Sequence, residues 1–265
     1  STQSKLRLVD VTLLNNLAEG GGGGIYINEG TLALERVSFT ANSSQDNGGA
    51  VFASGIYATF WGGQFVSNVG KKGGGIYTTG CTTVNIEGAN FVSNQASEGG
   101  GIFDNQSQSA LLNRLTFVSN QANTQGGGSA FNGTANLVVG NSQWVENVSS
   151  SGSAIHWFNA INSKLYNSTI TANNPLSNGP ALVVNGTSTL TLMNAIVWNS
   201  GEEFSVDTGS VDEKVTASHC IVSNGPTGTN VSSEDPLFIQ SPLNGIFDLN
   251  LAIGSPAIDA GTTEN

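Results

Sequence analysis

The sequence is short of charged residues, and of basic residues above all. Only 10% of its 265 residues are Asp, Glu, Lys or Arg, and 19 acidic residues stand against 8 basic ones, for a net charge of −11. A nucleic-acid-binding surface needs a basic patch to neutralise phosphates, and anionic membrane surfaces attract basic segments. The composition therefore argues against a nucleic-acid partner and against binding to anionic lipid.

The sequence also lacks long apolar runs and helical periodicity, and its two cysteines are not expected to form a disulfide. No stretch approaches the roughly eighteen apolar residues that span a bilayer as a helix, so we expect no membrane insertion of this chain. No segment has the i, i+3, i+4, i+7 apolar spacing of an amphipathic helix. Cys81 and Cys220 fall five repeats apart, beyond disulfide reach, and are predicted to be free thiols. No signal peptide is visible, so we interpret the chain as a mature or excised fragment.

What the sequence does have is a repeat. An aromatic or aliphatic residue followed three positions later by Asn occurs nine times at intervals of 25 to 27 residues. The copies are Leu13–Asn16, Phe39–Asn42, Phe65–Asn68, Phe91–Asn94, Phe117–Asn120, Trp144–Asn147, Ile170–Asn173, Ile196–Asn199 and Ile221–Asn224. The register near Ile196 is ambiguous by one residue. A period of this length with strand-like content indicates a β-solenoid.

Each repeat holds about three short strands. A glycine pair followed by two apolar residues, as in Gly74-Gly75-Ile76-Tyr77, comes after each Asn, and a segment of alternating apolar residues such as Leu32-Ala33-Leu34 lies between. We predict an all-β fold, a single-stranded right-handed parallel β-helix of about nine coils with about 26 residues per coil. Residues 1–224 form this helix, and residues 225–265, which break the period and carry four of the six prolines, form a C-terminal capping segment.

Two columns of apolar residues are predicted to point inward. One is the motif column that begins with Phe39 and Phe65, and the other lies five residues earlier and consists of Leu34, Phe60, Ile86, Leu112, Val139 and Leu165. The Asn column fits a turn, where Asn tolerates the left-handed αL conformation and its amide can bond the adjacent backbone. Stacked from coil to coil, these amides can form a ladder.

The motif pair Gly-Gly-[Ala/Ile]-aliphatic and Phe-x-x-Asn resembles the repeat of the chlamydial polymorphic outer-membrane proteins, over residues 13 to 200. That resemblance implies a β-helical autotransporter passenger that acts in adhesion. The C-terminal segments Asp235–Phe238, Leu249–Leu251 and Ser255–Gly261 are similar to the end of many large bacterial surface proteins with parallel β-helix repeats. In that group the segment closes the helix. Both resemblances imply a secreted or cell-surface location.

One candidate site emerges from the predicted register. The turn positions four and three residues before each motif aromatic stack as a surface row, which includes Glu35, Trp61, Glu87 and Arg114. Glu35 and Glu87 are then two coils apart, about 9 to 10 Å, with Trp61 between them. An aromatic ring flanked by polar groups suits a sugar-stacking platform, and two facing carboxylates suit an inverting glycosidase. A solvated turn row with one exposed aromatic is the plain alternative.

Other candidates for chemistry are weaker. Glu202, Glu203, Asp207, Asp212 and Glu213 form an acidic insertion that could hold Ca²⁺, although their spacing does not fit an EF-hand loop. His156 and His219 lie far apart, and we interpret His156 as a strand or turn residue and His219 as a turn residue. No spacing suggests zinc, and no phosphate loop is present. No organic cofactor is indicated, and calcium is the one candidate ion.

Three functions remain open. The first is a non-catalytic surface rod that binds glycan or a host-surface ligand as part of a larger protein, and the resemblances favour it. The second is a polysaccharide-active enzyme, a glycosidase or lyase of the β-helix type. The scarcity of basic residues near carboxylates argues against that reading. The third is a structural spacer that displays another domain.

Overall fold

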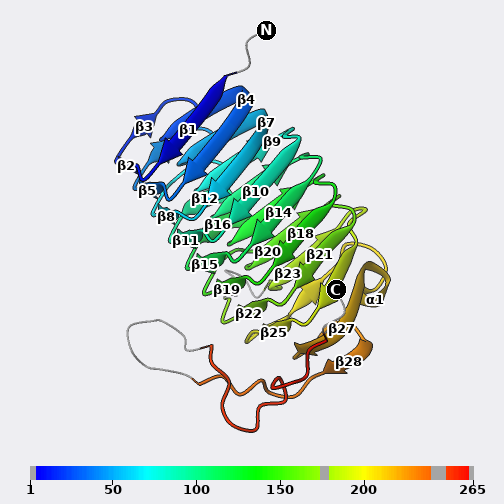
Figure 1. Cartoon of the computed structure of the whole chain (residues 1–265). Helices are drawn as coiled ribbons and strands as arrows, with labels where there is room; N and C mark the ends of the chain where they lie inside the picture. The colour runs from blue at the N-terminus through cyan, green and yellow to red at the C-terminus, as the bar shows by residue number, and fades with distance from the viewer. Residues whose placement is uncertain (1–3, 174–178, 240–248, 263–265) are drawn as a thin grey trace.

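The chain is a parallel β-solenoid (Figure 1). This architecture is taken from a computed structural model that describes residues 4–173, 179–239 and 249–262. Strands stack from one coil to the next along one rod, and the pairings between the strands of successive coils are parallel. Within the described residues the only helix is α1 (Val211–Lys214). The predicted all-β parallel solenoid is confirmed.

The strands form three faces. The first face contains the starts of β4 (Ile25–Glu35) and β7 (Val51–Trp61), followed by β9 (Ile76–Thr79), β13 (Ile102–Asn105), β17 (Ser129–Asn132), β20 (Ile155–Phe158), β23 (Leu182–Asn185) and β26 (Phe204–Ser205). The second contains β1 (Lys5–Val9), the ends of β4 and β7, then β10 (Thr83–Glu87), β14 (Ala110–Asn113), β18 (Leu137–Gly140), β21 (Ser163–Tyr166), β24 (Leu190–Met193), β27 (Val215–Val222) and β28 (Gly228–Ser232).

The third face carries the motif residues. It contains β2 (Thr12–Leu14), β5 (Ser38–Thr40), β8 (Gln64–Val66), β11 (Asn90–Val92), β15 (Thr116–Val118), β19 (Gln143–Val145), β22 (Thr169–Thr171) and β25 (Ile196–Trp198). The strands of the three faces are hydrogen-bonded into one large sheet. Two short pairs lie outside it, β3 (Leu17–Ala18) with β6 (Ser43–Ser44) and β12 (Gln95–Glu98) with β16 (Gln121–Gln125).

The number of coils is slightly lower than predicted. Paired residues on successive coils are 26 or 27 positions apart over most of the rod, as in Phe39 with Phe65 and Phe117 with Trp144. Nine motif copies enclose eight intervals, so the rod has about eight turns, whereas we predicted about nine coils by counting the copies themselves.

The core is a continuous stack of side chains inside the coils. Phe65, Phe91 and Phe117 are almost fully buried, and the ring centroids of neighbouring pairs lie 4.7 Å and 4.9 Å apart. These separations match the spacing of adjacent strands, about 4.8 Å. The column five residues earlier is buried from Leu34 to Leu165 as predicted. Successive side chains of a strand point to opposite faces, so each short strand contributes one or two residues to this core.

The register changes by one residue at the last two motif copies. Ile170 pairs with Val197, and Val197 pairs with Val222. Val197 and Val222 belong to the core cluster, whereas Ile196 is half-buried. Ile196 and Ile221 were therefore placed one residue too early by the motif. The spacing alone could not resolve this because both neighbours at each position are aliphatic.

The motif asparagines form a buried ladder. The Asn94 side chain accepts hydrogen bonds through Oδ1 from both the backbone N and Nδ2 of Asn68, at 3.0 and 2.9 Å. Its own Nδ2 donates to the carbonyl of Phe65 at 2.8 Å and to Oδ1 of Asn120 at 2.9 Å. The same pattern continues to Asn173 and Asn199. Each amide thereby joins consecutive coils, and the predicted ladder is confirmed as far as Asn199. The ninth motif asparagine, Asn224, is exposed, and Asn199 donates to Glu203 instead.

The αL conformation lies one residue before the ladder asparagines from Asn42 to Asn173. The residues in that position have φ between 53° and 56°, and they are Ala41, Ser67, Ser93, Ser119, Glu146 and Ala172. The prediction that Asn itself adopts αL was wrong. Asn instead supplies the hydrogen bonds that hold the strained residue in place, which explains why alanine or serine is tolerated there despite a conformation that L-residues rarely adopt.

Glycine is required where the next corner brings backbones together. Gly73 has φ +64°, and a Cβ on the following Gly74 would overlap the carbonyl oxygen of Gly100 on the next coil. A Cβ on Gly75 would likewise lie 2.7 Å from the carbonyl oxygen of Gly101. The glycine pair Gly74-Gly75 is thus explained by the close approach of two backbones, which follows the left-handed Gly73.

We expect Phe91→Ala to lower the free energy of unfolding by about 3–5 kcal/mol, because it removes a buried ring and its contacts with Phe65 and Phe117. Denaturant unfolding measures the change, and Leu111→Ala, which truncates an exposed side chain, is the control. A loss below about 1 kcal/mol would contradict the packing described above.

Asn94→Ala tests the ladder separately from the core. It removes the acceptor of two Asn68 donors in a site that water does not reach. Each unsatisfied buried donor costs about 1–3 kcal/mol, so we expect a loss of about 2–5 kcal/mol in the same unfolding measurement. Asn90→Ala on the outer side of β11 is the control. Equal stability of the two variants would mean that the ladder amide contributes nothing.

Candidate functional site

The register brings the predicted row together. Glu35 pairs with Trp61 and Trp61 with Glu87 at the ends of β4, β7 and β10, and Asn113 follows on β14. These residues form one column at the corner between the second and third faces. Arg114 lies one position further, in the adjacent turn column with Arg36, Gly62 and Gly88. We call Glu35, Trp61, Glu87 and Arg114, with their partners, the corner row.

Both glutamates of the corner row are bonded to arginines. Glu35 accepts from Arg7 at 3.0 Å and from Arg36 at 2.5 Å, and Glu87 pairs with Arg114 at 2.5 Å. Asn113 Nδ2 also donates to Glu87 at 3.2 Å. These pairs are largely solvent-exposed, where an ion pair is worth at most about 1 kcal/mol. Their main effect is to fix side-chain positions around Trp61.

Arg36 also joins the row to the first coil. Its Nε and Nη2 donate to the two oxygens of Asp10 at 2.7 and 2.9 Å. These hydrogen bonds hold the pKa of Asp10 below its usual value and raise the pKa of Arg36. Three carboxylates of the row (Asp10, Glu35, Glu87) are therefore matched by three arginines (Arg7, Arg36, Arg114). The row is close to neutral although the protein is strongly acidic.

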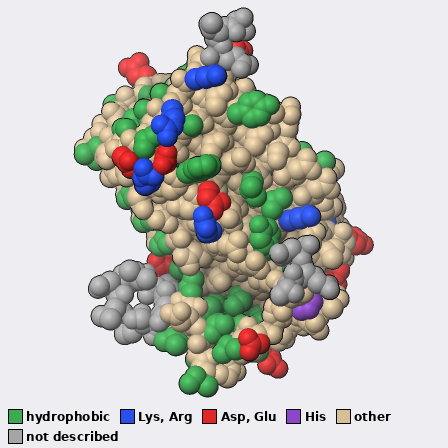
Figure 2. Space-filling view, viewed as in Figure 1, with side chains coloured by type: hydrophobic (Ala, Val, Ile, Leu, Met, Phe, Trp, Pro, Cys, Tyr) green, Lys and Arg blue, Asp and Glu red, His purple; other side chains and the backbone are tan. Residues whose placement is uncertain are grey.

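Trp61 is exposed to solvent between the ion pairs of Glu35 and Glu87. Its side chain is 60% exposed. The turn column beside it holds Gly62 on its own coil and Gly88 on the next, both with φ +66°, and a Cβ on Gly88 would meet no atom within 4 Å. Among the described residues, no side chain of the turn column fills the space between Arg36 and Arg114, because both intervening positions are glycine. Figure 2 shows acidic and basic side chains gathered along this face, with hydrophobic side chains between them.

The carboxylates of the acidic insertion do not lie together in one site. Glu203 is fully buried and ends the asparagine ladder, because its carboxylate accepts from the backbone N and Nδ2 of Asn199, each at 2.6 Å. Asp207 pairs with Lys214 at 2.9 Å, Asp212 accepts from Thr227 at 2.7 Å, and Glu213 caps α1. Across the described ranges no group of three or more His, Cys, Asp or Glu side chains is placed to hold a metal ion.

Two buried groups lie away from the corner row. Asp104 on β13 is surrounded by the hydroxyls of Thr78, Ser107 and Thr134, which donate to its carboxylate. Burial nonetheless raises its pKa. His156 on β20 is also buried, and burial lowers its pKa to about 4. His156 is a strand residue, as expected, whereas His219, predicted to be a turn residue, lies within β27. Cys81 and Cys220 are free and buried, as predicted.

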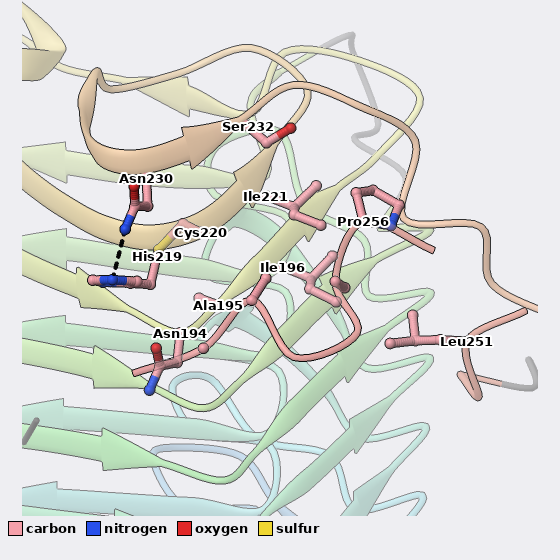
Figure 3. Close-up of a pocket in the computed structure, with 13 residues that line it drawn as sticks. Asn194, Ala195, Ile196, His219, Cys220, Ile221, Asn230, Ser232, Leu251 and Pro256 are labelled. Carbon is pink, nitrogen blue, oxygen red and sulfur yellow. Dashed lines mark hydrogen bonds between the residues drawn. The ribbon is translucent and has the colours of Figure 1, made fainter. Parts of the chain in front are cut away.

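The C-terminal residues fold back against the last coils. Thr262 exchanges two hydrogen bonds with the Asn194 side chain, both 2.9 Å, and Ser255 donates to the carbonyl of Pro236 at 2.6 Å. Figure 3 shows the small hollow between this segment and β25, β27 and β28, where Asn230 is bonded to His219 at 2.9 Å. Its volume is about 160 Å³, and Ile196, Ile221 and Pro256 make it mostly apolar.

Sequence reasoning missed part of the corner row. Asp10 and Arg7 were not in the predicted row, whereas Arg36 stood in it beside Glu35. Asp10 lies 26 residues before Arg36, so its signal was available. Arg7 lies 28 residues before Glu35 and pairs in register with Ala33, so periodicity does not place it at the corner. What the spacing could not give is the pairing of the charges, since a turn residue can point along the rod in either direction.

Comparison with known proteins supports the repeat. The family model of the Chlamydia polymorphic membrane protein repeat matches residues 10–28 and 36–54. Both segments contain one Asn motif and one glycine pair, so the resemblance inferred from those residues is confirmed for the first two coils. No curated protein and no solved structure matches the chain. Repeats of this kind on a β-solenoid indicate an outer-membrane or surface protein. No helix in the described ranges is long and apolar enough to cross a membrane.

The buried carboxyl of Asp104 gives a pH prediction. Its pKa is raised in the folded state, so folding favours the protonated form. The stability that this group contributes is present below its unfolded pKa of 3.8 and is lost as pH rises through the raised value. We expect Asp104→Asn, which cannot ionise, to unfold with a smaller loss of stability between pH 4 and pH 8 than the parent.

The measurement is the free energy of unfolding of parent and variant at each pH. Glu203, whose pKa is also raised, and His156, whose pKa is lowered, titrate in both proteins and cancel in the difference. Asp46→Asn, at an exposed aspartate, is the control. Parallel pH curves for the parent and Asp104→Asn would show that the buried carboxyl does not titrate differently on unfolding.

Proposed function

We propose that the protein is a non-catalytic, secreted or cell-surface β-helix that binds an extended glycan, as carried on a host or other cell surface, through the corner row. The observation that carries this proposal is the exposed Trp61 ring, held on the edge of a sheet between two arginine-bonded glutamates. An aromatic face stacks on the apolar side of a sugar ring, and flanking charged groups bond its hydroxyls. The similarity to a membrane-protein repeat supports a surface location.

The state of the two glutamates supports binding over catalysis. A general acid must deliver a proton to the leaving group within hydrogen-bond reach. Glu35 and Glu87 each have an oxygen occupied by a guanidinium, at 2.5 Å in both cases. A polysaccharide-active enzyme remains the alternative, because two carboxylates two coils apart still flank Trp61. A structural spacer is the second alternative, and it needs no site at all.

We expect Trp61→Ala to weaken glycan binding by about 1–3 kcal/mol, roughly 5- to 150-fold in Kd, with unfolding unchanged. A glycan array followed by calorimetry on the hits measures this. Tyr26→Ala is a matched control, since Tyr26 is 59% exposed against 60% for Trp61 and lies on the first face, outside the row.

Three outcomes distinguish the functions. Selective loss of binding in Trp61→Ala supports the corner row. Equal binding by Trp61→Ala and the parent means that the site is elsewhere. Depolymerisation of a bound glycan by the parent, abolished in Glu35→Gln or Glu87→Gln, replaces the binding function with the enzyme.

A further inference from the structure

The corner row continues beyond Arg114 as a line of asparagines. Asn141, Asn167 and Asn194 follow on successive coils in the same turn column, each with φ near +50°. Their side chains are bonded in series: Asn167 Nδ2 donates to Asn141 at 3.3 Å, and Asn194 Nδ2 to Asn167 at 3.0 Å. Asn141 Nδ2 in turn donates to Asn113 at 2.7 Å, which connects the line to the corner row. Unlike the core ladder, Asn141 and Asn167 are exposed.

A groove runs beside this line on the third face. It has a volume of about 620 Å³. Its polar lining includes Arg114, Thr116, Asn141, Gln143, Asn167 and Thr169, and Leu249 of the C-terminal segment also borders it. No carboxylate lines it within the described residues. Gln143 and Thr169 lie on the outward side of β19 and β22, so their polar groups face the groove and take no part in core packing.

A second aromatic side chain lies further along the column of Trp61. The column passes from Asn113 to Gly140 and then to Tyr166. Tyr166 is half-buried, and its ring lies against Gly140, where a Cβ would overlap it. Trp61 and Tyr166 are four coils apart, roughly 19 Å at the usual strand spacing. The corner therefore has an aromatic group toward each end, with amides and hydroxyls between.

We propose that the corner row and this groove form one continuous site for a linear, uncharged polysaccharide laid along the rod axis. This inference rests on the proposed function, and it adds the class and the direction of the ligand. From Glu35 to Asn167 the site covers five coil-to-coil steps, roughly 24 Å. One coil is close to the advance of one sugar residue in an extended chain, so successive sugars meet equivalent positions on successive coils.

The distribution of charge on the protein favours an uncharged ligand. The three carboxylates of the corner row are balanced by three arginines, and the groove presents amides and hydroxyls, which both donate and accept hydrogen bonds. Sugar hydroxyls have the same dual capacity. An acidic polysaccharide would approach a protein of net charge −11, whose overall field repels it. Arg114, the one cation among the described residues that line the groove, is already paired with Glu87.

The experiment measures affinity against chain length. The probes are β-1,4-glucan, β-1,3-glucan, β-1,4-mannan and chitin fragments of two to eight residues, with oligogalacturonate and hyaluronan fragments as the acidic set. We expect binding to a neutral series only, with affinity that rises until about five residues and then levels off, since five coil steps are available.

The variant Gln143→Ala/Thr169→Ala tests the groove itself. It removes two neutral hydrogen-bonding groups, so we expect roughly tenfold weaker binding of the longest neutral fragment and little change for the shortest. Gln121→Ala/Thr191→Ala makes the same two substitutions at exposed strand positions on other parts of the coil and should bind like the parent. Circular dichroism and unfolding curves confirm that both variants fold.

The outcomes separate this inference from the proposed function. The groove inference is overturned if Trp61-dependent binding shows no dependence on chain length, prefers acidic fragments, or is unchanged in Gln143→Ala/Thr169→Ala. The corner row then remains as a site for a single sugar or for an acidic glycan. Absence of any binding that depends on Trp61, across both sets, overturns the proposed function and this inference with it.

Discussion

The structure depends on the way one coil is fixed on the next, and the buried asparagine amide does most to fix it. At each turn this amide closes hydrogen bonds with the coil before it and the coil after it, in a region without water. A buried polar group is costly unless it is fully bonded, so the ladder tolerates one register only. A slip by one residue would leave several amides without partners and would turn the phenylalanine stack outward.

That fixed register is also what creates the candidate site. Glu35, Trp61 and Glu87 are far apart in the chain and adjacent on the surface because the coils below them cannot slide. The ladder stops where Glu203 replaces the next asparagine: a carboxylate accepts two hydrogen bonds from Asn199 but has no N–H to pass on. Beyond that point α1, β28 and the C-terminal segment depart from the regular coil.

The surface of the rod reflects its low charge content. With few lysines and arginines available, three of the basic residues are used in one place, each bonded to a glutamate beside Trp61. The rest of that corner consists of amides and hydroxyls, which suit a ligand rich in hydroxyl groups. The family resemblance covers two coils and indicates an outer-membrane or surface protein, but it says nothing of a ligand.

The sequence by itself determined the solenoid, its period, its inward columns and the surface row, because a repeat of about 26 residues forces equivalent positions to stack. It also indicated the ladder, although it assigned αL to Asn42 and its equivalents rather than to the residue before them. Only the tertiary structure decided the shift to Val197 and Val222, since two adjacent aliphatic residues fit the spacing equally well. The same holds for Glu203 and for the pairing of Arg36 and Arg114 with the glutamates beside Trp61. Periodicity gives the coil on which a side chain sits, whereas its burial and its partner depend on the atoms that the neighbouring coils and the insertion place around it.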